Sequence, residues 1–210
     1  MPPRFQFLGL GRAIALLSAL LIGAGLARAQ GEAGDIDRLV EALRLGPGTI
    51  VAEIGAGDGA LTVSLARHVG AGGRIFTTEL GDDRLRTLRL AVSRADLSQI
   101  EVVEARATST NLSDTCCDAI VMRDVYHHFG DPAAMNASLL ASLKPGGRLA
   151  ILDFGPPPGK ESDTAAGRSR DGHHGVGRQT VSRELAEAGF TAIASTALDG
   201  RRFMVVGRKP

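Results

Sequence analysis

The feature that most constrains this chain is a glycine-rich stretch directly after an apolar segment. Residues 49–54 form an apolar run, residues 55–60 have the sequence Gly-Ala-Gly-Asp-Gly-Ala, and a helical pattern of apolar side chains follows from Leu61. Glycines at such a turn let the backbone reverse tightly and let a ligand approach it closely. The stretch predicts the first strand–turn–helix unit of an open α/β sheet.

Two ligand classes are compatible with this turn. Gly55, Gly57 and Ala60 match the dinucleotide pattern Gly-x-Gly-x-x-Gly/Ala. Glu79 follows about twenty residues later, where an acid that binds a ribose is expected. The pattern alone does not separate a nicotinamide dinucleotide from S-adenosylmethionine.

The charges around the turn favour S-adenosylmethionine. A dinucleotide places its pyrophosphate at the helix N-terminus, but here Glu53 precedes the turn and Asp58 lies inside it. Carboxylates oppose a pyrophosphate and suit a ligand with a sulfonium and an ammonium group. A role for Asp58 as a helix cap alone stays open. The predicted cofactor contacts in the turn are Glu53, Gly55, Ala56, Gly57, Asp58 and Gly59.

The remaining chain continues the alternation of strands and helices. After a leading helix over residues 35–45, strands are expected at 49–54, 74–79, 100–103, 118–122 and 148–154, helices at 60–69, 82–95, 131–143 and 180–188, and a final hairpin at 190–197 and 202–206. The arginines of residues 82–95 are interpreted as a solvated helix face. Residues 155–177 form a long irregular loop that can cover a cleft. The pattern predicts a single α/β domain over residues 30–210.

A dense polar cluster follows the strand at residues 118–122. Asp124, Tyr126, His127 and His128 come where the carboxyl end of that strand faces the expected cleft. They are the candidates for a general base, which is needed only when a substrate must lose a proton. His173 and His174, in the long loop, can approach the same place. Because a helical His-x-x-x-His spacing is missing, we predict no metal site.

The two cysteines and the net charge limit which functions the sequence supports. Cys116 and Cys117 are adjacent, and because a disulfide between neighbours is strained, we expect small apolar residues leading into a buried strand. The formal net charge is +1. A nearly neutral chain gives no electrostatic footprint for nucleic acid. The oligomeric state is left open.

Residues 1–29 resemble an export signal. Arg4 and Arg12 precede a short apolar run, and Ala27-Arg28-Ala29 fits a cleavage site before Gln30. Loss of the three arginines in this segment leaves a net charge of −2. We expect a signal peptide and a periplasmic or secreted domain. An uncleaved membrane anchor, with membrane contact through residues 1–29 only, and a misassigned start remain open.

The whole set of motifs resembles the class I S-adenosylmethionine-dependent methyltransferases, in the small-molecule subgroup that includes ubiquinone-pathway enzymes. The resemblance covers residues 35–208 and is carried by segments 53–59, 117–121, 143–149 and 188–190 together with Glu79. It implies a Rossmann-like, mostly parallel seven-stranded sheet with helices on both faces and a C-terminal antiparallel hairpin. It also implies that the glycine turn lies under the cofactor's methionine and ribose and that Glu79 holds the ribose hydroxyls.

The resemblance has one departure. The position where the family often has an acid that contacts adenine is occupied by Arg106, so the backbone of Ala107 or the side chain of Asn111 is the expected substitute. Arg123 completes the set of cofactor candidates.

The expected reaction is direct displacement at the sulfonium methyl, which needs alignment and no protein nucleophile. The acceptor is an unidentified small molecule. An NAD(P)-dependent oxidoreductase and a non-catalytic, exported ligand-binding member of the fold are the alternatives.

Overall fold

The computed structural model describes residues 34–162, 164–168 and 174–210. The chain divides into two units, Met1–Arg38 and Leu39–Pro210. A helix covers residues 34–43, close to the expected leading helix. The expected signal peptide at residues 1–29 lies outside the described residues, and a single domain over residues 30–210 stays a prediction. Within the described ranges, no helix combines the length and the hydropathy needed to cross a bilayer.

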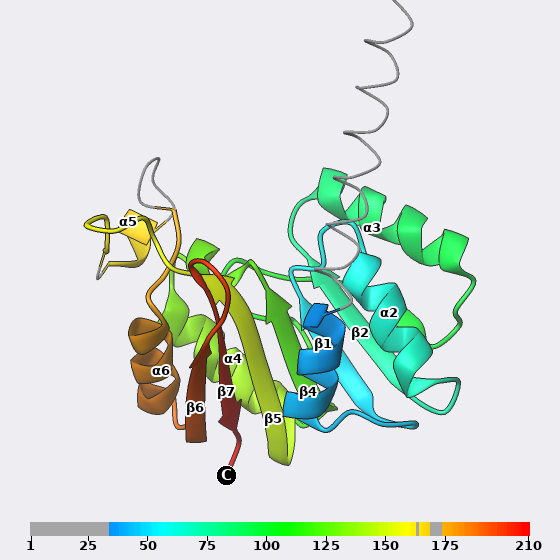
Figure 1. Ribbon diagram of the computed structural model, residues 1–210. Helices are drawn as coiled ribbons and strands as arrows, with labels where there is room; N and C mark the ends of the chain where they lie inside the picture. The colour runs from blue at the N-terminus through cyan, green and yellow to red at the C-terminus, as the bar shows by residue number, and fades with distance from the viewer. Residues whose placement is uncertain (1–33, 163, 169–173) are drawn as a thin grey trace, which may run out of the picture. The chain divides into compact units, whose positions relative to one another are not determined.

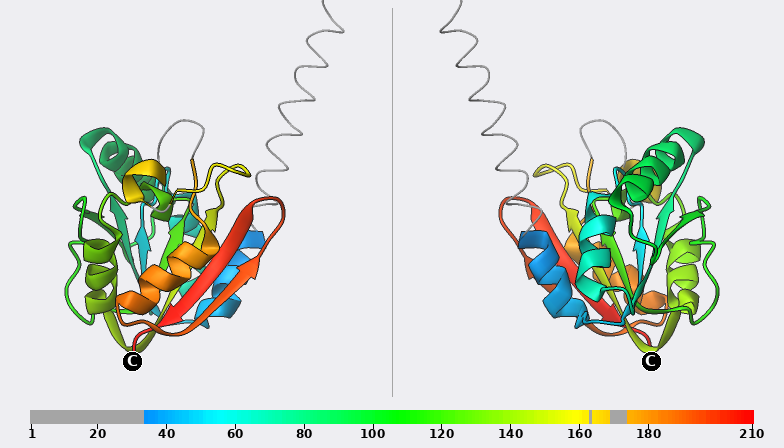
Figure 2. Two further views of the ribbon diagram at one scale, coloured as in Figure 1. Left: turned by 90° about the vertical axis from the view of Figure 1, so that its left-hand side faces the viewer. Right: turned by 90° about the vertical axis from the view of Figure 1, so that its right-hand side faces the viewer.

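The second unit is built on one seven-stranded sheet with the order β3-β2-β1-β4-β5-β7-β6. The strands are β1 (Ile50–Ile54), β2 (Arg74–Glu79), β3 (Ile100–Glu104), β4 (Cys117–Arg123), β5 (Leu143–Phe154), β6 (Thr191–Ala197) and β7 (Arg202–Arg208). Strands β1 to β5 pair in parallel. Strand β7 is antiparallel to both β5 and β6, and the hairpin it forms with β6 lies at one edge of the sheet (Figure 2). The predicted fold class is confirmed.

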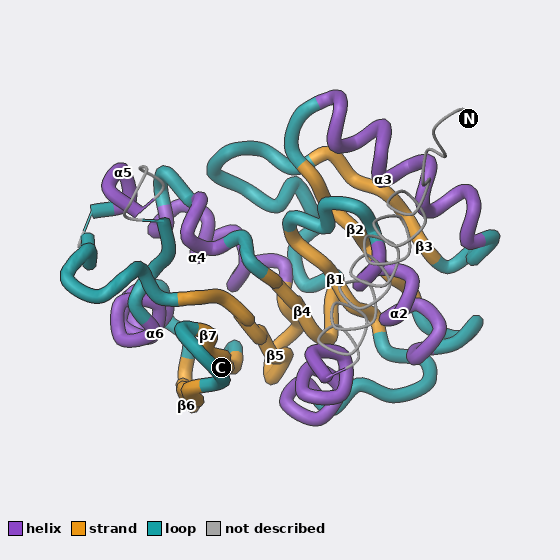
Figure 3. Tube along the Cα trace, turned by 45° about the horizontal axis from the view of Figure 1, so that its top comes forward, coloured by secondary structure: helices purple, strands orange, loops and turns teal. Residues whose placement is uncertain are grey.

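Helices cover both faces of this sheet (Figures 1 and 3). They are α2 (Ala60–Val69), α3 (Asp82–Ala95), α4 (Pro132–Ser142), α5 (Ala165–Arg168) and α6 (Arg178–Glu187), with a 3₁₀ turn η1 (Tyr126–His128) after β4. Helices α2 and α3 lie beside β1 to β3, and α4 and α6 lie beside the other half of the sheet. The bounds of α2, β2 and α3 are those expected from the sequence.

The two faces follow from the alternation of side chains along β1, because successive residues of a strand point to opposite sides. Ala52 and Ile54 belong to the apolar cluster that contains Leu139 of α4 and Leu185 of α6. Glu53 points the other way, and its carboxylate accepts a hydrogen bond from the hydroxyl of Thr62 on α2. The core of the unit therefore lies in two layers, one on each side of the sheet.

Strand β1 is the point where the strand order reverses. It pairs with β2 on one side and with β4 on the other. The connections after β1 and β4 leave in opposite directions across the sheet, so a crevice opens at the carboxyl ends of these strands. Ligands of open α/β sheets bind at such a crevice.

The expected turn at residues 144–147 is part of β5 instead. Leu143 pairs with Cys117, and the register then shifts before Arg148 pairs with Ala119. Gly146, inside this irregularity, has a φ of +77°. The two glycines thus make an irregular entry to the strand, and the strand begins five residues earlier than the apolar run indicates.

The cysteines are joined, so the expectation of two unpaired residues is wrong. Cys116 and Cys117 form a disulfide between adjacent residues. Thr115, directly before the pair, has a φ of +52°, so the backbone leaves its extended path where the pair begins. Cys117 is nevertheless fully buried at the start of β4, as expected.

Candidate cofactor site

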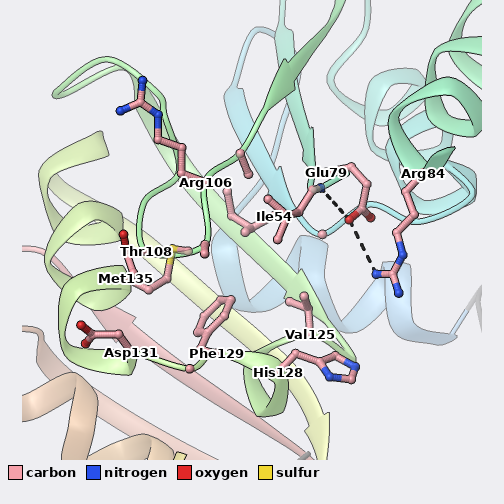
Figure 4. A pocket seen from close by; sticks show the side chains of 15 residues that line it. Ile54, Glu79, Arg84, Arg106, Thr108, Val125, His128, Phe129, Asp131 and Met135 are labelled. Carbon is pink, nitrogen blue, oxygen red and sulfur yellow. Dashed lines mark hydrogen bonds and ion pairs between the residues drawn. The ribbon is translucent and has the colours of Figure 1, made fainter. Parts of the chain in front are cut away.

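A cavity of about 600 Å³ opens at the carboxyl ends of β1, β2 and β4. Its volume is in the range that small-molecule sites occupy. It is lined by Ile54, Gly55, Glu79, Leu80, Arg84, Ala105, Arg106, Ala107, Thr108, Val125, His128, Phe129, Gly130, Asp131 and Met135 (Figure 4). Five of the predicted site residues are in this set, namely Gly55, Glu79, Arg106, Ala107 and His128.

Gly55 is required at the start of the turn by its backbone and by a close neighbour. Its φ is +73°, and a Cβ at this position would lie 2.4 Å from Cγ2 of Val125. The N–H groups of Gly55 and Ala56 both donate to the carbonyl of Thr78, at 3.0 and 2.9 Å. The turn is therefore fixed against the end of β2 on one side and against the loop after β4 on the other.

Glu79 connects this turn to the cavity. Its Oε2 accepts a hydrogen bond of 2.7 Å from the N–H of Gly57, and its Oε1 accepts one of 2.8 Å from the N–H of Leu80. The guanidinium of Arg84 lies 3.8 Å from Oε1, which Figure 4 shows at the cavity wall. Each carboxylate oxygen offers two acceptor positions. Glu79 thus keeps acceptor capacity toward the cavity, which fits a ribose diol.

The rest of the wall is largely apolar. Leu80 leaves half of its side-chain surface exposed, although it is large and apolar. Ile54, Phe129 and Met135 add further apolar surface. An exposed leucine next to an acid that is predicted to bind ribose fits contact with the face of a purine ring, so the donor set and the walls together are compatible with S-adenosylmethionine.

The residues expected to contact adenine only partly line the cavity. Arg106 and Ala107 line the cavity, but the guanidinium of Arg106 is turned away from Glu79 in Figure 4. The side-chain amide of Asn111 donates to the carbonyl of Glu104 at 3.0 Å and does not line the cavity. Of the two expected substitutes for an acid, the backbone of Ala107 is therefore the one in place.

The two carboxylates on which the charge argument depended do not line the cavity. Glu53 is buried, and this burial raises its pKa to about 7, while the Thr62 hydroxyl and the charge of Arg123 act in the opposite direction. Asp58 is exposed, and its carboxylate accepts a hydrogen bond of 3.1 Å from the N–H of Ala60. Glu53 therefore favours a cationic ligand less than its charge in the sequence indicates, because with a pKa of about 7 its carboxyl is only partly ionised at neutral pH.

The other turn residues and Arg123 do not line the cavity. Ala56 is buried, and Gly57 and Gly59 do not line the cavity. The charge of Arg123 lowers the pKa of Glu53, which places the guanidinium in the neighbourhood of that acid. Direct contact of these residues with a cofactor stays a prediction.

The polar cluster after β4 divides into an exposed and an enclosed part. His128 lines the cavity, and its pKa is lowered by burial first and then by the neighbouring His127 and His174. Asp124 lies 3.8 Å from the guanidinium of Arg202 and does not line the cavity. His128 is therefore the member of the cluster that is placed to contact a substrate.

Tyr126 is enclosed. Its hydroxyl donates to Oε2 of Glu184 at 2.9 Å and accepts from the amide of Asn136 at 2.8 Å. The side chain has no exposed surface, and burial and the charge of Glu184 raise its pKa. Glu184 also binds the buried guanidinium of Arg168. This arrangement fits a structural role and opposes that of a general base.

Sequence reasoning missed several lining residues. Arg84 was assigned to a solvated helix face, yet it pairs with Glu79 at the cavity. The exposure of Leu80 and the approach of Phe129 and Met135 depend on tertiary contacts. The position of Leu80, directly after the acid at the end of β2, was the one available signal.

Residues 52–151 match a family model described as a methyltransferase domain. The match covers slightly less than half of the chain, and over these residues the sequence is similar to that family.

Curated relatives share part of the chain. The ubiquinone/menaquinone biosynthesis C-methyltransferase UbiE of Marinomonas sp. (strain MWYL1) is 31% identical over 111 residues, which are 52% of this chain and 44% of that protein. The chain thus matches somewhat less than half the length of this relative.

Solved structures share the fold. A SAM-dependent methyltransferase from Aquifex aeolicus superimposes with a TM-score of 0.70 at 20% identity, covering 84% of this chain and 90% of that one. A possible exported protein from Bordetella parapertussis gives a TM-score of 0.67 at 20% identity, covering 89% and 69%. Both place the methyltransferase domain in the Rossmann-like fold described above.

Proposed function

We propose that this protein is an S-adenosylmethionine-dependent methyltransferase that acts on a small molecule. The observation that carries the proposal is the position of Glu79, whose carboxylate binds the glycine turn and still faces a cavity at the switch point of the sheet. The matched methyltransferase domain supports the same activity.

The residues of the chain would hold the cofactor in three ways. Glu79 accepts hydrogen bonds from the ribose hydroxyls, Leu80 contacts the purine, and the turn that begins at Gly55 brings the backbone close to the ligand. When bound, S-adenosylmethionine supplies a methyl group activated by its sulfonium. The protein contributes alignment of the two reactants and exclusion of water.

His128 is the proposed proton acceptor when the methyl acceptor carries a dissociable proton. Its pKa is lowered, so the ring is neutral at pH 7 and can accept a proton at a ring nitrogen. It lines the same cavity as Glu79. His127 has its Nδ1 in a hydrogen bond with Asp153 and stands behind His128.

The acceptor is proposed to be a largely apolar small molecule. Val125, Phe129 and Met135 line the same cavity as Glu79. Apolar side chains of this kind favour an acceptor with apolar or ring surface. The name of the curated relative, a C-methyltransferase of ubiquinone and menaquinone biosynthesis, supports such a molecule as the first class to examine.

The proposal is tested by methyl transfer from S-adenosylmethionine labelled in its methyl group. Purified chain is incubated with a panel of phenols, hydroquinones and amines, and label is followed into the organic phase. Transfer that needs the protein and is lost with S-adenosylhomocysteine supports the proposal. Nicotinamide fluorescence that changes when the protein is added, without any transfer, would support the oxidoreductase alternative instead.

For localisation, we propose export to the periplasm or the medium, with retention at the membrane through residues 1–29 as the alternative. The basic and apolar pattern of this segment supports it. The fold neighbour titled as a possible exported protein is in line with it. Fractionation of cells with N-terminal sequencing gives the test: a mature chain that starts at Gln30 is expected, and an intact Met1 in the cytosol would exclude export.

A further inference from the structure

Three histidines come together beside the cavity, and one of them, His128, lines it. His127 and His128 belong to η1 after β4, and His174 comes from the segment that precedes α6. One ring nitrogen of each lies within 4.8 Å of one nitrogen of each of the others. His127 is buried, whereas His128 and His174 are exposed, and Figure 4 shows His128 at the cavity edge.

His127 has an unused nitrogen inside this group. Its Nε2 is buried and has no hydrogen-bond partner among the described residues. The other ring nitrogen, Nδ1, lies 2.7 Å from Oδ1 of Asp153, and both side chains are almost wholly buried. A buried polar nitrogen without a partner costs free energy, so its presence calls for a ligand.

Asp153 fixes the orientation of that nitrogen. Its Oδ2 accepts from the backbone N–H of His127 at 3.2 Å, and its Oδ1 also accepts from the N–H of Phe154 at 2.8 Å. A carboxylate held in this way accepts a hydrogen bond from a protonated Nδ1. In the neutral ring, this leaves the lone pair on Nε2. Carboxylate–histidine pairs of this kind orient histidine ligands in metal sites.

We propose that His127, His128 and His174 form a binding site for a divalent transition-metal ion; with the ion bound, His128 is a ligand and does not serve as the proton acceptor proposed above. Imidazole nitrogens suit zinc, nickel, copper and iron, whereas magnesium and calcium prefer oxygen ligands. Three histidines leave at least one coordination position open. Because His128 lines the cavity, the open position is directed to the space where an acceptor oxygen or nitrogen binds.

The ring nitrogens lie farther apart than in a metal site, so the histidines must move closer together when the ion binds. Zinc–nitrogen bonds of about 2.0–2.1 Å in a tetrahedral shell place the nitrogens about 3.4 Å apart. The exposed rings of His128 and His174 have the freedom to move toward His127, which Asp153 holds in place. The three rings are already in contact. The ring centroid of His127 lies 4.0 Å from that of His128 and 4.4 Å from that of His174.

This site differs from the sequence expectation of no metal. That expectation rested on the missing His-x-x-x-His spacing of a helix. In the structure, two adjacent histidines share one 3₁₀ turn and the third comes from a segment more than forty residues later. Such a set is assembled by the fold and is invisible to a search for local spacing.

The test uses the full chain without a histidine tag, stripped with a chelator and dialysed. Zinc content is measured by elemental analysis after equilibration, and Co²⁺ is titrated while its visible d–d absorption is followed. The variants are His128→Ala and His174→Ala, which remove exposed side chains, and Asp153→Asn. His68→Ala is the matched control, because His68 is an exposed histidine on α2 away from the cluster.

We expect one ion per chain and a Co²⁺ spectrum typical of nitrogen ligands in four- or five-coordination. His128→Ala and His174→Ala should each weaken binding at least tenfold, Asp153→Asn about 10- to 100-fold, and His68→Ala not at all. Substoichiometric metal in the wild-type chain would overturn the proposal even if a variant fails to fold. Equal affinity in wild type, His128→Ala and His174→Ala would overturn it as well. Neither outcome bears on cofactor binding, which is measured separately.

Discussion

The carboxylate of Glu79 accepts a hydrogen bond of 2.7 Å from the backbone N–H of Gly57, a residue twenty-two positions earlier in the chain. This bond joins the acid at the end of β2 to the glycine turn after β1. The two segments that we propose to hold the cofactor are therefore joined by a direct hydrogen bond. A ligand that binds Glu79 is held against the turn by the same contact.

Removal of this acid should weaken cofactor binding. Glu79→Ala loses the acceptor for the ribose and leaves the Gly57 N–H without its partner, so we expect S-adenosylhomocysteine to bind about 1–3 kcal/mol more weakly in calorimetry. Glu101→Ala is the control, since Glu101 pairs with Arg74 on the exposed surface of β3. Equal affinity in wild type and Glu79→Ala would refute the role of this acid.

Alanine substitutions at two glycines of the turn, Gly55 and Gly57, should lower the free energy of unfolding by different amounts. Gly55→Ala places a Cβ 2.4 Å from Val125, whereas Gly57→Ala meets nothing within 4 Å, and both have a positive φ. We expect Gly57→Ala to cost about 1 kcal/mol of unfolding free energy from backbone strain alone. Gly55→Ala should cost about 2 kcal/mol or more, because overpacking is added.

Urea denaturation of both variants and of the double variant Gly55→Ala/Val125→Ala measures this difference. The double variant should recover part of the loss, since Val125→Ala removes the atoms that collide. If Gly55→Ala and Gly57→Ala lose the same free energy, the packing of the turn against Val125 is not as described.

Glu53 predicts a pH dependence of stability. Its pKa is raised from 4.5 to about 7 in the folded protein, so the folded state holds the proton more tightly than the unfolded state does. The contribution is fully present below about pH 4.5 and is lost as pH rises toward 7, with a total of about 3 kcal/mol. Glu53→Gln, which cannot ionise, should lack this loss.

The measurement is the difference in unfolding free energy between Glu53→Gln and wild type at pH 5 and pH 8. The variant should gain on the wild type by roughly 2.5 kcal/mol between these two values, because part of the contribution is already lost at pH 5. A difference that stays constant with pH would show that the Glu53 carboxyl is solvated and that its pKa is not raised.

Tyr126 is expected to stabilise the fold without taking part in the reaction. Tyr126→Phe leaves the Asn136 amide and the Glu184 carboxylate each one partner short, so a loss of about 1–3 kcal/mol of unfolding free energy is expected. Affinity for S-adenosylhomocysteine and the rate of methyl transfer should stay close to wild type. A variant of full stability with abolished transfer would return Tyr126 to the list of catalytic candidates.

Local patterns predicted most of the fold. The apolar periodicity placed α2, β2 and α3 with their observed bounds, and the Asp-Gly turn marked the terminal hairpin, because these signals depend on neighbours in sequence. The start of β5 was missed because glycines and a proline are atypical of strands. The disulfide was missed because the argument considered only the strain of adjacent cysteines.

The site was predictable where function requires a fixed backbone. Gly55 and Glu79 could be named from the turn and the strand end, and both line the cavity. Glu53 was placed at the ligand because the sequence shows its charge but not its burial under α2. The approach of His174 to His127 and His128 was anticipated from the sequence, but the buried and unpartnered Nε2 of His127 and the exposure of Leu80 depend on tertiary contacts.

The most direct test of the central claim is calorimetric titration of the folded full chain with S-adenosylhomocysteine. We expect saturable binding to one site per chain at ligand concentrations well below millimolar. NADH should not compete for this site. Absence of binding at millimolar S-adenosylhomocysteine, from a sample shown to be folded by circular dichroism, would contradict it.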